Sequence, residues 1–139
     1  MVKHTNTLKL VDYYFQAEKD KQYLFLVTEL YTIDLKTIIK QRIIDKNTIP
    51  LYLYQILKGL QYLHKRNIAH RDLSPSNILL QLHSHRIAIA DFGNAKVINY
   101  FENSIAYVGT RFYRAPELIF GANTYTTQVD MWSFGCILV

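Results

Sequence analysis

His70-Arg71-Asp72-Leu73-Ser74-Pro75-Ser76-Asn77 is a polar stretch in the middle of the chain, and Asp91-Phe92-Gly93 follows it after two short apolar runs. The runs, residues 78–82 and 86–90, are rich in residues that favour strands, and the polar link between them predicts a hairpin turn. One rigid hairpin would then fix the separation between the two polar stretches that flank it.

Residues before this hairpin predict strands and then helices. Residues 8–15 and 23–28 are β-favouring, and the polar run 16–22 is expected to break them into two strands. Asp34 is a suitable N-cap for a short helix that extends to about Arg42. Apolar residues at helical spacing after Pro50 predict a longer helix, which ends near Lys65.

Residues after the hairpin show less regularity. Residues 91–126 are expected to be irregular apart from a short helix at 116–120. Thr127 with Asp130 three residues later resembles a capping box and predicts a final helix that runs to Val139. Because the sequence stops inside this apolar helix, we expect an incomplete chain rather than a complete one.

Composition narrows the class of protein. The chain has 139 residues, of which 50% are hydrophobic and 19% charged, so one domain, or a piece of one, can build a core. The single cysteine, Cys136, excludes an intrachain disulfide framework and a multi-cysteine zinc site. No secretory leader and no apolar run long enough to span a bilayer is visible in the sequence, so we expect no membrane partner and a cytoplasmic or nuclear location.

The net charge of +5 leaves a basic nucleic-acid binder as one hypothesis. The basic residues are scattered rather than gathered in a stripe, which is typical of solvated faces. Net charge alone supports that hypothesis, and we expect no nucleic-acid partner.

The ordered set of loop motifs resembles the eukaryotic protein kinases. It consists of His70-Arg71-Asp72, Asn77, Asp91-Phe92-Gly93, Ala115-Pro116-Glu117 and Asp130-x-Trp132-Ser133-x-Gly135. The resemblance implies an α+β fold of two lobes. Within a partial kinase domain over residues 1–139, residues 1–30 would be the end of the N-lobe with the approach to the hinge, and residues 31–139 would be most of the helical C-lobe.

The resemblance also implies the cofactors ATP and Mg²⁺ and a role for each polar residue. Phosphoryl transfer needs positioning and charge stabilisation, with a carboxylate to accept the proton of the incoming hydroxyl, which matches Asp72. Mg²⁺ prefers a few oxygen ligands, which matches Asp91 and Asn77. By position, the adenine site would be formed by the gatekeeper Thr28, by backbone groups of Glu29, Leu30 and Tyr31, and by Leu79 as its floor.

A second set of residues matches the kinase activation segment. Arg71 resembles the arginine that pairs with a phosphorylated segment, and Lys96 and Arg111 could join that basic site. Ser104 and Ile105 stand at the usual activation position of the cyclin-dependent kinases, where the expected threonine is absent, which counts against that subfamily. Tyr107 matches the tyrosine that shaggy-like kinases (glycogen synthase kinase) phosphorylate, and Lys96 matches part of their primed-phosphate pocket. Both subfamilies belong to the CMGC group and remain open here; we favour the cyclin-dependent one, with a cyclin-like or scaffold partner and protein substrates whose Ser or Thr can precede Pro.

Departures from the kinase pattern keep a second hypothesis open. Ser74 stands where Ser/Thr kinases normally carry a lysine that neutralises charge on the transferred phosphate. The sequence also contains no Gly-rich phosphate loop and no strand lysine of the Val-Ala-Ile-Lys type. The alternatives are therefore a serine/threonine kinase segment, which is our main prediction, and a truncated, non-catalytic, pseudokinase-like interaction module.

Overall fold

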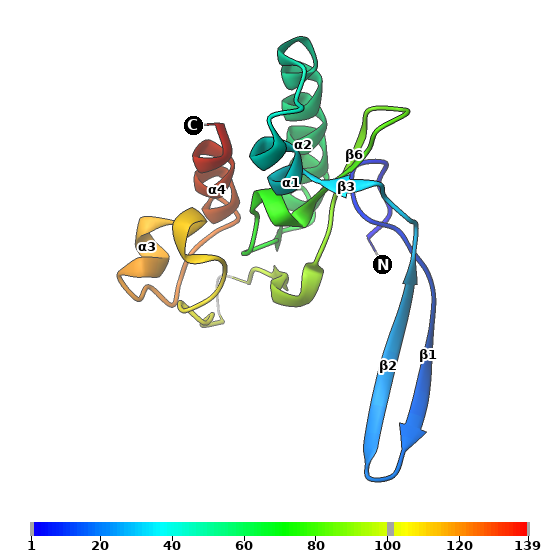
Figure 1. The fold of residues 1–139 in the computed structure, drawn as a ribbon. Helices are drawn as coiled ribbons and strands as arrows, with labels where there is room; N and C mark the ends of the chain where they lie inside the picture. Colours follow the sequence, from blue (N-terminus) through cyan, green and yellow to red (C-terminus); the bar gives the residue numbers. More distant parts are fainter. Residues whose placement is uncertain (1, 100–101, 139) are drawn as a thin grey trace.

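The central hairpin has the predicted place and pairing. The structure, a computed structural model, describes residues 2–99 and 102–138 (Figure 1). Strands β5 (Ile78–Gln81) and β6 (Arg86–Ile89) pair antiparallel from Ile78 opposite Ile89 to Gln81 opposite Arg86. The short strand β3 (Ile33–Asp34) pairs with β5, so the sheet has the order β3-β5-β6.

The first two strands form a longer hairpin than the sequence predicted. Strand β1 (Leu10–Glu18) pairs with β2 (Lys21–Thr28) as far as Glu18 opposite Lys21, so the break expected at residues 16–22 is wrong. All of these residues except Leu10 are exposed, so polar side chains carry no burial cost and the backbone ladder continues to the turn. Figure 1 shows this hairpin projecting away from the other elements.

The residues before β1 pack against the body of the molecule. Asn6 is buried, and its side-chain amide donates to the carbonyl of Ile87 at 2.9 Å. The backbone amides of Leu8 and Ile89 donate to the carbonyls of Ile89 and Asn6, respectively, at 2.8 and 3.0 Å. The first residues of the proposed N-lobe segment therefore bind to strand β6, and the chain leaves the body of the molecule only at β1.

The predicted helices are confirmed. Helix α1 (Leu35–Gln41) begins at Asp34, whose carboxylate accepts hydrogen bonds from the amide and the hydroxyl of Thr37, each at 2.8 Å. Burial opposes the charge, but these hydrogen bonds prevail and hold the pKa of Asp34 below its usual value. Helix α2 (Ile49–His64) follows the 3₁₀ turn η1 (Lys46–Thr48) and carries Pro50 in its first turn.

The remaining elements are short and surround the polar loops. They are β4 (Ile68–Ala69), η2 (Pro75–Asn77), η3 (Phe92–Asn94), β7 (Lys96–Val97), η4 (Arg111–Tyr113), α3 (Pro116–Ile119) and α4 (Val129–Leu138). Strands β4 and β7 pair with each other. Val139, the expected last residue of the final helix, lies outside the described residues.

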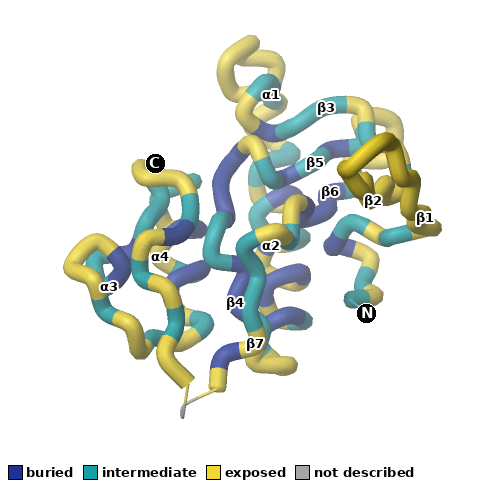
Figure 2. Tube along the Cα trace, turned by 90° about the horizontal axis from the view of Figure 1, so that it is seen from below, coloured by how far each residue is buried: buried dark blue, intermediate teal, exposed yellow. Residues whose placement is uncertain are grey.

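The core lies where α2 crosses the central sheet. Ile56 and Leu60 of α2 pack with Ile87 and Ile89 of β6, and Leu73 of the polar loop is buried in the same cluster. Figure 2 shows these buried segments as the dark centre of the molecule, with exposed residues around it. Among the described residues, no helix has the length and apolarity that crossing a bilayer requires.

Asp130 in the first turn of α4 connects this helix to the polar loop. Its side chain is completely buried and accepts hydrogen bonds from the backbone amides of His70 and Arg71 and from Nε2 of His64, each at 2.8 Å. The capping box expected for Asp130 is therefore wrong, because its carboxylate oxygens are directed to the loop instead of back to Thr127. Helix α4 still begins where the sequence predicted.

A first prediction concerns Gly59, which is buried in α2. A Cβ there would lie 2.7 Å from the carbonyl oxygen of Asn6 and 2.8 Å from Cδ1 of Ile89. Helix propensity favours alanine by about 1 kcal/mol, whereas overpacking typically costs about 1–3 kcal/mol. The backbone carbonyl is held by the amide of Ile89, so we expect Gly59→Ala to lower the urea midpoint of unfolding.

Gly135→Ala is the matched control for this substitution. Gly135 lies in α4, and a Cβ there meets no atom within 4 Å. We expect this variant to be unchanged or to gain up to about 1 kcal/mol. Equal midpoints for the two variants would contradict close packing at Gly59.

A second prediction concerns the buried carboxylate of Asp130. In Asp130→Asn, an amide N–H would face one of the three donors, and a buried group left without a partner costs about 1–3 kcal/mol. We expect a loss of that size or more in the free energy of unfolding, measured by urea titration followed by circular dichroism. Asp20→Asn in the exposed β1–β2 turn is the control, and a similar stability for both variants would rule out Asp130 as an anchor.

Candidate active site

Asp72 is held by three hydrogen bonds from its own chain. Its Oδ1 accepts from the backbone amide and from Oγ1 of Thr110, both at 2.7 Å, and its Oδ2 accepts from Nδ2 of Asn94 at 3.2 Å. Within the described parts of the chain, no Lys, Arg or His forms an ion pair with Asp72. Neutral donors on two other loops therefore fix this half-buried carboxylate.

His70 joins the Asp72 loop to the end of β6. Its ring is completely buried, with Nε2 2.9 Å from the carbonyl oxygen of Ala90 and Nδ1 3.3 Å from the backbone nitrogen of Asp72. A carbonyl only accepts and an amide only donates, so the neutral ring carries its proton on Nε2. His70 thus acts as a positioning residue that spans the site, with Phe92 packed edge-on against it.

Arg71 adopts a backbone conformation that its neighbours must accommodate. Its φ is +66°, and its carbonyl oxygen would lie 2.3 Å from a Cβ at Gly109. Gly109, itself at φ +83°, therefore allows the Thr110 segment to approach the loop. The Arg71 side chain donates to the carbonyl of Asn94 at 2.6 Å and to the hydroxyl of Tyr125 at 2.9 Å.

Asn77 and Asp91 lie beside each other at the open end of the central hairpin. The amide of Ala90, directly before Asp91, donates to the carbonyl of Asn77 at 2.8 Å. The Asn77 side chain donates through Nδ2 to the carbonyl of Asp72, also at 2.8 Å, so its acceptor oxygen remains available. Asp91 is exposed at φ +58°, with one carboxylate oxygen bound to the amide of Gly93 at 3.2 Å.

These oxygens fit a Mg²⁺ ion that is shared with a phosphate ligand. In the described residues, no group of three or more His, Cys, Asp or Glu side chains could hold a metal by itself. Mg²⁺ is usually bound through one or two carboxylates together with water and substrate phosphates, so a single carboxylate and an amide oxygen are a suitable partial set. The predicted metal ligands are thus neighbours with free acceptor positions.

A cavity of about 520 Å³ opens next to Asp91, between the base of the β1–β2 hairpin and η3. Apart from Asp91 and Thr28, the residues that line it are the apolar Val2, Leu8, Leu10, Leu26 and Phe92, together with Gly93. Such a lining suits an apolar or aromatic ligand group, with the Asp91 carboxylate at the edge of the cavity. Thr28 is the one predicted adenine-site residue that lines this cavity.

The other predicted adenine-site residues lie apart from the cavity lining. The Glu29 carboxylate pairs with Arg86 of β6 at 2.6 Å, and Leu30 is 90% exposed. The guanidinium of Arg86 lies over the Tyr31 ring, and burial raises the pKa of the Tyr31 hydroxyl. Leu79 is half-buried in β5 opposite Asp34. Their adenine-site roles stay predictions.

The predicted activation-segment residues do not converge on one site. Lys96 donates to the carbonyl of Asn103 and lies 3.8 Å from the Glu102 carboxylate. The Tyr107 ring is 82% exposed beneath the Arg114 guanidinium, and Arg111 is exposed. The backbone amide of Ser104 donates to the carbonyl of Asn123. The structure does not bring Arg71, Lys96 and Arg111 onto one shared partner, and their phosphate-binding role stays a prediction.

Sequence reasoning missed four residues that shape the site: Asn94, Thr110, Tyr125 and Asp130 in its anchoring role. Asn94 directly follows Asp91-Phe92-Gly93, and this position beside a recognised motif is the one feature of the sequence that could have indicated its role. Thr110 reaches Asp72 across 38 residues of chain and Asp130 reaches Arg71 across 59, and no sequence spacing indicates either contact.

Comparison with known proteins gives a consistent result. The protein kinase domain family matches residues 1–139. "Probable serine/threonine-protein kinase glkA" of Dictyostelium discoideum is 38% identical over 99% of this chain and 29% of its own length. Glycogen synthase kinase 1 of Pyricularia oryzae is 38% identical over 99% of this chain and 37% of its own length.

The chain thus spans about a third of the length of these curated relatives. The family match covers both the hairpin with its flanking polar loops and the segments that hold Asp72 in place. On its full-length match and on the arrangement of its loops, the chain belongs to the protein kinase family.

Proposed function

We propose that this chain is a catalytic segment of a serine/threonine protein kinase, which transfers the γ-phosphate of ATP to a hydroxyl of a protein substrate. One observation carries the proposal: a single loop and hairpin hold Asp72, Asn77 and Asp91 together, with Asn77 donating to the Asp72 carbonyl at 2.8 Å. The named relatives, both kinases, support the same reaction.

Asp72 would orient the substrate hydroxyl and accept its proton. A carboxylate offers about four acceptor positions, and Thr110 and Asn94 occupy three of them. One position on Oδ2 is left for the alcohol. Proton transfer to a positioned side chain contributes about 10²–10⁴-fold to rate, so this fixed geometry supports Asp72 as the general base.

Asp91 and Asn77 would hold Mg²⁺, which when bound neutralises charge on the phosphates. The nucleotide base would occupy the apolar cavity beside Thr28, which places the phosphate end toward Asp91. The protein's own contribution is then positional: η3 and the hairpin set where Asp91 and Asn77 stand relative to Asp72.

The subfamily, substrates and partners also belong to this proposal. The name of the Pyricularia oryzae relative favours the shaggy-like side of the CMGC group, which matches Tyr107 and Lys96. Neither of the two relatives named above is described as a cyclin-dependent kinase, which is the subfamily that we favoured from the sequence. Protein substrates with Ser or Thr, in some cases before Pro, a cyclin-like or scaffold partner, and a cytoplasmic or nuclear location remain part of the proposal.

A non-catalytic interaction module is the second candidate function. Ser74 favours it, because this residue is 2% exposed and neutral, and the described residues provide no cation within ion-pair distance of Asp72. A phosphate in transfer would therefore have one fewer positive partner in this loop. The same fold would then present surfaces to other proteins without turnover.

A third prediction separates these candidates. In the protein at its natural length, Asp91→Asn should weaken nucleotide binding in the presence of Mg²⁺ at least tenfold, since an amide replaces the anionic ligand of the metal, and should leave any metal-free binding unchanged. Calorimetric titration with ATP, with and without Mg²⁺, measures both. Asp20→Asn in the exposed turn is the matched control.

The outcomes distinguish the two candidates. Metal-dependent binding that Asp91→Asn abolishes, together with phosphate transfer to a basic protein, is the result expected for a kinase. A parent protein that neither binds Mg²⁺·ATP nor transfers phosphate would exclude the kinase proposal and favour the interaction module.

A further inference from the structure

The Asp72 carboxylate is positioned unequally at its two oxygens. Oδ1 receives two hydrogen bonds from Thr110, each at 2.7 Å, and Oδ2 receives a single one from Asn94 at 3.2 Å. Oδ2 is also the oxygen with an acceptor position to spare. Beyond the two hydrogen bonds that hold Oδ1 of the same planar group, one neutral amide restrains the oxygen that would meet a substrate hydroxyl.

We propose that Asn94 is a positioning residue for the general base: its side-chain amide fixes Oδ2 of Asp72, which forms no ion pair with the cation of its own loop, Arg71, or with any other described residue. The inference rests on the proposed function, which names Asp72 as the base. It assigns a specific task to Asn94, the last residue of the turn η3 that begins after Asp91.

The charges around Asp72 explain why this contact matters. In the described residues the ion pairs formed by Lys and Arg are Arg86–Glu29 and Lys96–Glu102, and His64 contacts the Asp130 carboxylate; none of these contacts includes Asp72. Ser74 in the same loop is buried and neutral. A hydrogen bond to an ionised carboxylate is stronger than one between neutral groups, so removing the single donor to Oδ2 loosens that side of the carboxylate.

The backbone and the side chain of Asn94 serve different partners. Its carbonyl accepts from Nε of Arg71 at 2.6 Å, whereas its Nδ2 donates to Asp72. The backbone contact persists when the side chain changes, and Ala95 still donates to the carbonyl of Phe92 to close η3. Substitution at position 94 can therefore test the contact to Asp72 without removing the contact to Arg71.

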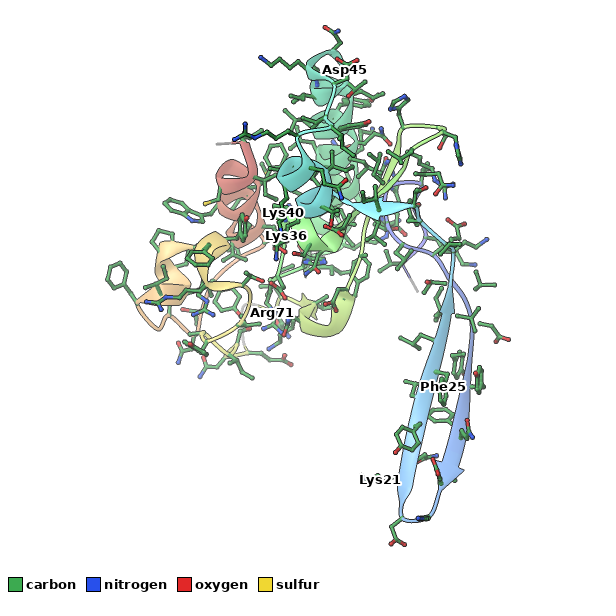
Figure 3. All side chains as sticks on the ribbon, in the orientation of Figure 1. Lys21, Phe25, Lys36, Lys40, Asp45 and Arg71 are labelled. Atoms are coloured by element: carbon green, nitrogen blue, oxygen red, sulfur yellow. The ribbon has the colours of Figure 1, made fainter. Side chains whose placement is uncertain are left out.

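Two substitutions and a control form the test. Asn94→Ala removes the donor. Asn94→Asp keeps the shape but replaces the donor by a like charge 3.2 Å from Oδ2, so it should disturb Asp72 more than alanine does. Asn47→Asp in η1 is the control; its neighbour Asp45 lies at the top of the view in Figure 3, well away from Arg71 near the middle.

The first measurement needs no activity and uses the full chain. The backbone amide of Thr110 donates to Oδ1 of Asp72, so its proton chemical shift in ¹⁵N-resolved NMR reports how well the carboxylate is held. We expect an upfield shift that increases from wild type to Asn94→Ala to Asn94→Asp, and no change in Asn47→Asp. A side chain that acted only by its shape would leave Asn94→Asp like wild type, which would overturn the inference.

The second measurement follows turnover in the protein at its natural length. In Asn94→Ala, loss of one hydrogen bond to the carboxylate should decrease kcat about tenfold. KM for ATP should stay nearly unchanged, because Asn94 contacts Asp72 and does not line the nucleotide cavity. A rise in KM with kcat unchanged would overturn the positioning role. Intact Mg²⁺·ATP binding with an unshifted Thr110 amide would remove Asn94 while leaving the proposed kinase function standing.

Discussion

The buried carboxylate of Asp130 is the constraint on which the site depends. A charge with no solvent exposure is tolerated only when donors surround it, and Asp130 obtains them from the backbone of His70 and Arg71 and from His64. The loop must therefore present two successive amides toward α4, and Arg71 takes a positive φ in the process. These two fixed amides directly precede Asp72 in the chain, so they restrain the backbone from which its carboxylate extends.

The rest of the site is built outward from that loop by contacts between elements. His70 spans from the loop to Ala90 at the end of β6, next to Asp91, and Asn77 closes the loop onto the Asp72 carbonyl. Arg71 and Asp91 both have φ between +58° and +66°, a conformation that costs energy for side chains of this size. The hydrogen bonds around these two residues supply the compensation.

The neutral hydrogen-bond donors of Asp72 distinguish this chain from a site built on paired charges. Thr110 and Asn94 orient the carboxylate by hydrogen bonds whose geometry is directional, whereas a cation would attract it from many directions. Orientation and charge stabilisation are therefore separated here: the described residues provide the first around Asp72, and they provide no ion pair for the second. An active kinase needs both orientation and charge stabilisation, whereas an interaction module needs neither. The two candidate functions therefore differ in whether a positive charge reaches the transferred phosphate.

The sequence by itself determined the elements whose causes are local: the β5–β6 hairpin, the Asp34 cap of α1, the apolar face of α2 and the polar residues at the loop ends. Tertiary structure alone decided that Asp130 anchors the loop instead of capping α4, that Asn94 and Thr110 hold Asp72, and that the β1–β2 ladder continues past its polar residues. Strand, turn and cap preferences act over a few residues and leave a pattern in the sequence. Hydrogen bonds such as Arg71–Asp130 join positions 59 apart, where chain connectivity imposes no spacing, so only the packed fold shows which donor meets which acceptor.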